Sequence, residues 1–302
     1  MNFREYVPLL LLLVLCASCS RTEQKENVPG ASGTFHVRLT DAYGEAIDLD
    51  RQPERVISLA PNLTEIVCFL GGENRLVART DYCDYPPSVR TLPSVGTLGS
   101  YNYEQIVALK PDLVLMMTFD GSSRGEYDRL KALGLRPFAL SEGMIDRVID
   151  GIDTVGNILG LQEVAAARTD SLRAIVKGIR GRADSSTPVT TFIVIDKSPL
   201  MTTSGGFIGS LVEAAGGENI AKDDPIAYPL YSRELLMRKR PDIILIPATS
   251  DDISAELLEL YPEWEQLQAE GKARLRTVPV NLIARPGPRI VEGLQQVFDA
   301  LH

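Results

Sequence analysis

The residues best suited to chemistry in this sequence gather in one short segment, TDYCDYPP, at positions 80–87. It holds two carboxylates and a thiol, which could bind a metal ion or take part in acid–base chemistry: Asp81, Cys83 and Asp84. It also holds two tyrosines, Tyr82 and Tyr85, whose rings could offer aromatic surface to a ligand. The segment by itself therefore leaves a metal site, a catalytic loop and the rim of a binding pocket open.

Residues that would assist metal or nucleophilic chemistry are scarce elsewhere. The chain has two histidines, His36 near its start and His302 at its end, and neither is well placed to serve a central site. The G-x-x-x-x-G-K-[ST] phosphate loop and a G-x-G-x-x-G turn after a strand are absent from the sequence. This shortage disfavours histidine-assisted catalysis, and it weakens a protein-held metal site, which usually draws on imidazole or thiolate ligands.

The first residues predict export. An arginine precedes an apolar run from Val7 to Leu15, which is too short to cross a bilayer and is typical of a secretory signal. The alanine and serine before Cys19 resemble a bacterial lipoprotein box, so residues 1–19 are expected to be a lipoprotein signal peptide with Cys19 lipidated. Ordinary secretion is the alternative. Residues 20–33 hold almost no apolar side chain, which predicts a flexible tether.

The mature protein is therefore expected outside the cytoplasm, in the periplasm or on the cell surface, bound to a membrane through its lipid alone. The formal net charge of −9 argues against a nucleic-acid partner, because backbone phosphates would be repelled. Cys68 and Cys83 remain after signal removal and could pair in an oxidising compartment. The alternative is a free buried thiol at Cys68, which falls on the apolar face of an expected helix.

The elements that must position these residues alternate between strands and helices. A hairpin is expected over 35–50, and the short strands RVISLA, LVART and LVLMM follow with helices between them. Asn62 is expected to cap the first of these helices, with Glu65 three residues on, and Gly71-Gly72 to end it. Tyr127, Leu130 and Leu133 are expected on one face of a later helix that Gly134 closes.

The middle of the chain has a different pattern. Between Met144 and Ala183 the sequence predicts only helix, a first piece ending near Gly160 and a second over 161–183. About twenty helical residues span about 30 Å, which is long enough to join two lobes. After Pro188 the alternation resumes with the strand TFIVID, a helix over 208–215, the strands IILI and TVPVNL, and a last helix entered through Pro288.

The second half of the chain repeats features of the first. The motif GGEN occurs at 71–74 and at 216–219, each time after an apolar helix. Four residues also recur at identical spacings, and each set leads into an apolar strand: Tyr101, Glu104, Pro111 and Asp112, then Tyr231, Glu234, Pro241 and Asp242. The predicted fold class is therefore α/β, with two lobes of mainly parallel sheet joined by one long helix and a ligand cleft between the lobes.

Seven motifs, in this order and spacing, resemble the periplasmic binding proteins of ABC importers for vitamin B12, ferric siderophores and haem: RVISLAPNLTEIV, TDYCDYPP, VGTLGSYNYEQIVALKPDLVL, TTSGGFIGSLVEAAGGENIA, YSRELL, RPDIILI and RPGPR. The resemblance runs from about Arg55 to the C-terminus. Within the family, the tyrosine-rich DYP loop with its GGEN and PGPR companions is most similar to the vitamin B12 binders. We therefore expect an N-terminal lobe at 34–143, a helical linker at 144–187 and a C-terminal lobe at 188–302. The periplasmic binding domain as a whole is expected at 55–302.

The resemblance also implies roles for single residues. Glu104 and Glu234, one in each lobe, match the glutamates that meet arginine pockets on the membrane permease. The alternative is that each only favours a helix N-terminus. Tyr82, with Tyr85, and Tyr228 match aromatic contacts to the ligand, and Arg285 matches a cleft arginine that suits amide or carboxylate groups. Ordinary loop packing and a surface arginine are the alternatives for these.

The sequence departs from the vitamin B12 pocket at several of its aromatic positions. Leu98, Met117 and Leu200 stand where that pocket has tryptophan or phenylalanine, and the sole tryptophan, Trp264, lies in a late helical stretch. The expected pocket remains apolar but has lost stacking surface. Haem or a ferric siderophore therefore remains open beside a corrinoid, although anionic siderophores would favour several cleft arginines and only Arg285 stands out.

The sequence as a whole predicts a lipid-anchored substrate-binding protein of an ABC importer. It is expected to be a monomer that binds cobalamin or a related corrinoid and passes it to a permease and its ATPase, with no reaction, no covalent cofactor and no metal site of its own. A haem or ferric siderophore binder of the same family is the alternative, followed by a chelatase-like enzyme and a surface lipoprotein without an ABC partner. In this interpretation TDYCDYPP is a rim loop in which Tyr82 and Tyr85 contact a metal chelate and Cys83 is a bystander.

Overall fold

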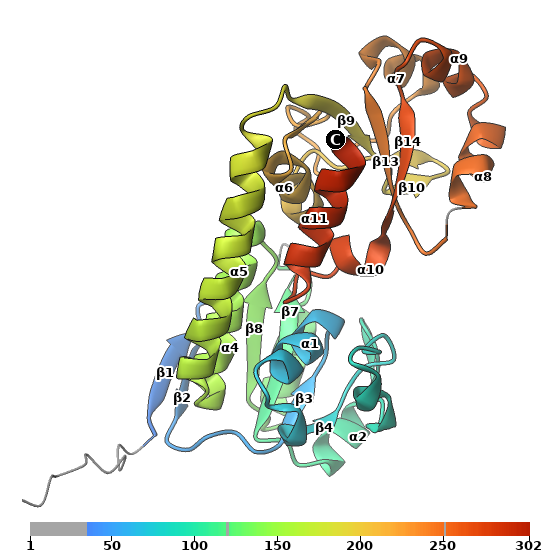
Figure 1. Cartoon of the computed structure of the whole chain (residues 1–302). Helices are drawn as coiled ribbons and strands as arrows, with labels where there is room; N and C mark the ends of the chain where they lie inside the picture. Colours follow the sequence, from blue (N-terminus) through green and yellow to red (C-terminus); the bar gives the residue numbers. More distant parts are fainter. Residues whose placement is uncertain (1–34, 119–120, 251) are drawn as a thin grey trace, which may run out of the picture. The chain divides into compact units, whose positions relative to one another are not determined.

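A computed structural model describes residues 35–118, 121–250 and 252–302 (Figure 1). The predicted signal peptide, its Cys19 and the tether lie outside the described residues. The N-terminal hairpin has the predicted form, with β1 (Val37–Thr40) antiparallel to β2 (Ala46–Leu49). No helix in the described part of the chain is long and apolar enough to cross a membrane.

The first lobe is built on a parallel sheet with the strand order β4-β3-β7-β8. Every residue of β3 and β7 is buried, which explains why these strands appear in the sequence as continuous apolar runs. The strands are β3 (Val56–Ser58), β4 (Leu76–Ala78), β7 (Leu113–Thr118) and β8 (Pro137–Ser141). The helical segments are α1 (Pro61–Phe69), η1 (Glu73–Arg75), η2 (Pro87–Thr91), α2 (Tyr103–Ala108) and α3 (Arg124–Ala132).

The second lobe repeats this arrangement with the strand order β12-β9-β13-β14, again all parallel. In both sheets the second strand along the chain lies at one edge, beside the first, and the third and fourth follow. The strands are β9 (Val189–Ile193), β12 (Gly217–Asn219), β13 (Ile243–Ala248) and β14 (Arg274–Pro279). The helices are α6 (Gly206–Ala214), α7 (Arg233–Lys239), α8 (Ile253–Leu260), α9 (Trp264–Ala269), α10 (Val280–Ile283) and α11 (Ile290–Leu301).

The long helix that was predicted to join the lobes is present, and a shorter helix precedes it. α4 (Ile145–Leu159) ends at Gly160, whose φ of 68° is the left-handed conformation that glycine adopts at little cost. α5 (Gln162–Ala183) follows with 22 residues. It runs beside α4 and also contacts α6 and α11 of the second lobe (Figure 1). One buried apolar cluster includes residues from both lobes, among them Phe138 and Phe207, so the described chain shares a core.

The duplicated aspartates make the same contacts in the two lobes. The carboxylate of Asp112 accepts a hydrogen bond from the backbone N–H of Arg55 at 3.0 Å, and that of Asp242 accepts one from the backbone N–H of Thr190, also at 3.0 Å. Their own N–H groups donate back to the carbonyls of Arg55 and Thr190 at 2.9 and 2.8 Å. Each aspartate therefore ties the start of the third strand of its lobe to the start of the first.

The backbone before these aspartates is also duplicated. Lys110 and Arg240 both adopt positive φ, 46° and 48°, a conformation that side-chain-bearing residues rarely take. Each stands directly before the proline of its repeat. The shared contacts, the shared backbone path and the shared strand order confirm that the two lobes are structurally related.

Some local expectations were wrong. Asn62 does not cap α1, because Pro61 takes the first helical position and the cap is Ala60. Asn62 is instead a residue of the helix, and its side chain is buried. The segment TVPVNL is strand only to Pro279, and Val280 begins α10. Leu133 follows the end of α3 and is exposed, so it does not share the buried face of Tyr127 and Leu130.

Candidate functional site

The TDYCDYPP loop presents its tyrosines to solvent. Tyr82 is 62% exposed and Tyr85 is 43% exposed. The N–H of Asp81 donates to the carbonyl of Gly96 at 2.9 Å, and its carboxylate accepts the hydroxyl of Ser94 at 2.5 Å. These bonds fix the loop to the small hairpin of β5 (Gly96–Thr97) and β6 (Ser100–Tyr101), whose turn holds the exposed Leu98.

The cysteines do not contribute reactive groups to this loop. Cys83 is buried, and its sulfur lies 3.1 Å from the hydroxyl of Thr80. Cys68 is half-buried, and both thiols are free. Burial raises the pKa of the Cys68 thiol to about 11, and the nearby carboxylates of Glu73 and Glu65 add to this effect. In the residues for which the structure gives positions, no group of three or more His, Cys, Asp and Glu side chains could hold a metal ion.

An apolar segment of the second lobe is exposed in a comparable way. Ile226, Tyr228 and Leu230 are 61%, 51% and 61% exposed, whereas Pro229 and Tyr231 turn inward. The segment lies alongside residues 202–204, because the N–H groups of Thr202 and Ser204 donate to the carbonyls of Pro229 and Ala227. The sequence singled out only Tyr228. Ile226 and Leu230 could have been identified from the sequence pattern, because a large apolar residue occurs at every second position from 226 to 230.

Two of the predicted pocket residues lie in the interior. Met117, in β7, is 5% exposed, and Leu200, in β11 (Leu200–Met201), is 4% exposed. β11 pairs with β10 (Asp196–Lys197). The sulfur of Met117 lies 3.3 Å from the side-chain nitrogen of Asn62, and Leu200 belongs to a core cluster that also contains Phe192. Neither side chain presents surface to a ligand in this structure.

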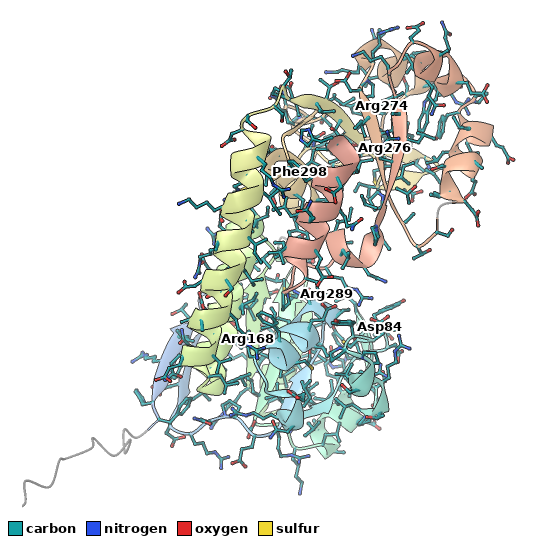
Figure 2. The ribbon with its side chains drawn as sticks, viewed as in Figure 1. Asp84, Arg168, Arg274, Arg276, Arg289 and Phe298 are labelled. Carbon is teal, nitrogen blue, oxygen red and sulfur yellow. The ribbon has the colours of Figure 1, made fainter. Side chains whose placement is uncertain are left out.

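Arg285 belongs to a four-residue charge cluster with Glu65, Asp84 and Arg289. Its Nη1 donates to Oδ1 of Asp84 at 2.6 Å and reaches Oε1 of Glu65 at 3.5 Å. Arg289 forms two hydrogen bonds with Glu65, of 2.8 Å from Nε and 2.7 Å from Nη2. Figure 2 shows Arg289 at the start of α11 and Asp84 in the first lobe. The cluster therefore joins α1 and the tyrosine loop to the segment that enters the last helix.

Two further contacts strengthen this junction. The guanidinium carbon of Arg289 lies 4.0 Å from the ring centroid of Tyr85, a cation–π contact. The side chain of Asn62 donates to the carbonyl of Pro286 at 3.1 Å. The segment RPGPR at 285–289 thus rests on α1 through two arginines and one backbone carbonyl.

The formal charges of the cluster cancel, since two guanidiniums face two carboxylates. The hydrogen bond from Arg285 holds the pKa of Asp84 below its ordinary value, although partial burial opposes this. The bonds to Glu65 raise the pKa of Arg289. A cavity of about 280 Å³ adjoins the cluster and is lined by side chains that include Cys68, Phe69 and Pro288. Its volume is at the lower limit of the roughly 300 to 1,000 Å³ of pockets that hold drug-sized ligands, and a corrinoid is larger than such ligands.

Glu104 and Glu234 occupy matching positions on the two lobes. Both are exposed and lie in the first turn of a helix, α2 and α7. The caps match as well, because the side chains of Asn102 and Ser232 each accept the N–H three residues on, at 3.0 and 3.1 Å. Hydrogen bonds from its own backbone N–H and from Ser232 lower the pKa of Glu234.

Comparison with known proteins gives consistent matches. A family model described as periplasmic binding protein matches residues 56–281. A vitamin B12-binding protein of Yersinia pestis (strain Pestoides F) is 36% identical over 206 residues, which are 67% of this chain and 73% of that protein. The crystal structure of the periplasmic vitamin B12 binding protein of Vibrio cholerae is 27% identical with a TM-score of 0.72, covering 82% of this chain and 96% of that one. A periplasmic haem-binding protein from Pseudomonas aeruginosa is 25% identical with a TM-score of 0.71, covering 82% and 92%.

Proposed function

Because this chain belongs to the periplasmic binding protein family, we propose that it binds cobalamin or a related corrinoid and delivers it to an ABC permease. The protein is a carrier and catalyses no reaction. Its ligand is a metal chelate that brings its own metal, and no cofactor is covalently attached. Delivery takes place outside the cytoplasm, with the protein anchored by a lipid on Cys19.

The exposure of Tyr82 and Tyr228, on loops of the two related lobes, carries this proposal. A large aromatic side chain left in water gains about 1.5 to 3 kcal/mol when a ligand covers it. Leu98, in the turn of the hairpin that is bonded to the Tyr82 loop, and Leu230, two residues after Tyr228, are also exposed and add aliphatic surface. Such a set suits a large, flat ring system, and it occurs in a chain that is 36% identical to a vitamin B12-binding protein.

Glu104 and Glu234 are the proposed contacts to the permease, whose ATPase drives import. Their matching positions support this role, since a pair of related lobes can offer the same carboxylate twice to one membrane partner. Both side chains are exposed at helix starts, so docking would cost little rearrangement.

Haem is the second candidate ligand, because the chain is also similar to the haem-binding protein of Pseudomonas aeruginosa. Haem carries carboxylates at its edge, and many ferric siderophores are anionic. The pairing of Arg285 with Asp84 favours the corrinoid over these, since the arginine is already neutralised.

A binding screen of the purified protein tests the proposal. Cyanocobalamin, cobinamide, haemin and a ferric hydroxamate are titrated separately, with calorimetric heat and shifts of the visible bands as readouts. We expect saturable binding of a corrinoid, which the double variant Tyr82→Ala, Tyr228→Ala should weaken. The control Leu133→Ala removes an exposed apolar side chain directly after α3 and should leave binding unchanged. Absence of heat and of band shifts with both corrinoids would refute corrinoid binding.

A further inference from the structure

Arg285 is held in an unusual state for a ligand-binding arginine. Its side chain is only 16% exposed, and its Nη1 bonds to Asp84 and Glu65 at 2.6 and 3.5 Å. Both hydrogen bonds that the structure gives it leave from this one nitrogen. Among the described residues, no acceptor is bonded to its Nε or Nη2, so these N–H groups remain for a further acceptor. The positive charge of Arg285 is therefore compensated by a neighbouring carboxylate, while its other N–H groups remain hydrogen-bond donors.

The carboxylate that neutralises Arg285 is Asp84, not Glu65. Glu65 is already bonded by both ends of the Arg289 fork at 2.7 and 2.8 Å, which leaves Asp84 as the short partner of Arg285. Arg90 reaches the other oxygen of Asp84 only at 4.0 Å and from an exposed side chain, so it screens Asp84 weakly. Asp84 is itself half-exposed, next to the exposed Tyr82 and Tyr85.

We propose that Asp84 is a specificity-determining residue: by pairing with Arg285 it excludes carboxylate-bearing chelates and leaves an arginine that bonds neutral amides. The inference rests on the proposed binding of a metal chelate beside Arg285. A carboxylate that approached this arginine would meet the like charge of Asp84 a few ångströms away, whereas an amide carbonyl would not. Discrimination of this kind comes from a repulsive group placed against the wrong ligand.

The matched variants are Asp84→Asn and Asp81→Asn. Both remove one negative charge from the same loop, but Asp81 bonds to Ser94 and not to Arg285. The probes are haemin, haemin dimethyl ester and cyanocobalamin. Haemin and its dimethyl ester share one ring and differ in their two carboxylates, so their comparison separates charge from ring stacking.

We expect Asp84→Asn to bind haemin about tenfold more tightly than the wild type, the size of one charge-assisted hydrogen bond. The gain should fall at high salt, be absent for the dimethyl ester and be absent in Asp81→Asn. It should also disappear in the double variant Asp84→Asn, Arg285→Gln, because the freed arginine is its source. Affinity for cyanocobalamin should change by less than about threefold, since Arg285 can still donate a hydrogen bond to an amide carbonyl of this ligand.

Equal haemin affinity in the wild type and in Asp84→Asn, or an equal gain for the dimethyl ester, would overturn the inference. Circular dichroism checks that each variant folds, and Asp84→Ser replaces Asp84→Asn if that variant does not. Cyanocobalamin binding by the wild type tests the proposed ligand separately: if only haemin binds, the corrinoid assignment fails, and the haemin gain in Asp84→Asn still decides the role of Asp84.

Discussion

Arg289 holds the carboxylate of Glu65 with both ends of its guanidinium, at 2.8 Å from Nε and 2.7 Å from Nη2. The two residues are 224 positions apart, on α1 and at the start of α11. The side chain of Glu65 is only 3% exposed and that of Arg289 is 17% exposed. The pair therefore fastens the C-terminal segment to the first lobe from inside the protein.

Removing one partner of this pair should destabilise the fold strongly. Arg289→Ala leaves a buried carboxylate with little compensation, which typically costs about 3 to 5 kcal/mol in the free energy of unfolding. Arg180→Ala is the matched control, because Arg180 pairs with Asp146 in an exposed ion pair worth at most about 1 kcal/mol. Urea unfolding measures both. Equal losses in the two variants would show that the Glu65 pair does not anchor the segment.

The contrast between Glu65 and the strands shows what the sequence could predict. β7 and β13 are apolar over consecutive residues, a local pattern that identifies a buried parallel strand without further information. Glu65 fits an equally local pattern, the capping box, and the sequence therefore assigned it to a helix start. Its actual partner, Arg289, follows from the folding of the C-terminal segment onto α1, which no local pattern encodes.

The candidate site was predictable to a similar degree. Tyr82 and Tyr228 were expected at the site because they match aromatic ligand contacts of the family that the sequence resembles, and both are exposed in the structure. Met117 and Leu200 were expected in the pocket from their positions in the family motifs, but the structure places both inside core clusters. The role of Arg285 changed most, since its pairing with Asp84 depends on loops that are 201 positions apart.

Asp242 should make the free energy of unfolding depend on pH. Burial alone would raise the pKa of this carboxyl, but hydrogen bonds from Lys272 and Thr190 outweigh burial and lower the pKa below its ordinary value. The folded state then favours the ionised form, so its stabilisation is present above the unfolded pKa of about 3.9 and is lost as pH falls through the lower folded pKa.

We therefore expect Asp242→Asn to be about 1 kcal/mol less stable than the wild type at pH 7, a modest value because Lys272 is partly exposed. The difference should shrink as the pH falls below about 4. Thermal unfolding at several pH values measures it, with the exposed Asp223→Asn as a control for the loss of one charge. A difference that stays constant from pH 7 to pH 3 would contradict the expected linkage.

The exposed tyrosines should affect affinity and leave stability unchanged. Tyr82→Ala removes a ring that is 62% exposed, so the free energy of unfolding should change by less than about 0.5 kcal/mol, and Tyr228→Ala removes one that is 51% exposed and should cost less than the loss of a buried ring. Each should weaken corrinoid binding about tenfold, the loss expected from an aromatic stacking surface. Tyr82→Phe and Tyr228→Phe keep the ring and should bind nearly as the wild type does. Calorimetry compares the alanine variants with the phenylalanine variants. Unchanged affinity in the alanine variants would show that the ligand does not bind at these loops.

Reversing the charge of Glu104 and Glu234 together should separate delivery from binding. If both carboxylates meet basic pockets on a permease, Glu104→Arg with Glu234→Arg abolishes uptake in cells while the purified protein keeps its corrinoid affinity within about twofold. Each reversal also puts a positive charge at a helix N-terminus, which costs about 0.3 to 1 kcal/mol. Glu163→Arg is the control for this cost, because Glu163 is an exposed acid in the first turn of α5. Full uptake by the doubly reversed protein would show that these glutamates only stabilise the N-termini of their helices. A loss of uptake in Glu163→Arg would show that the effect comes from lost stability and not from lost docking.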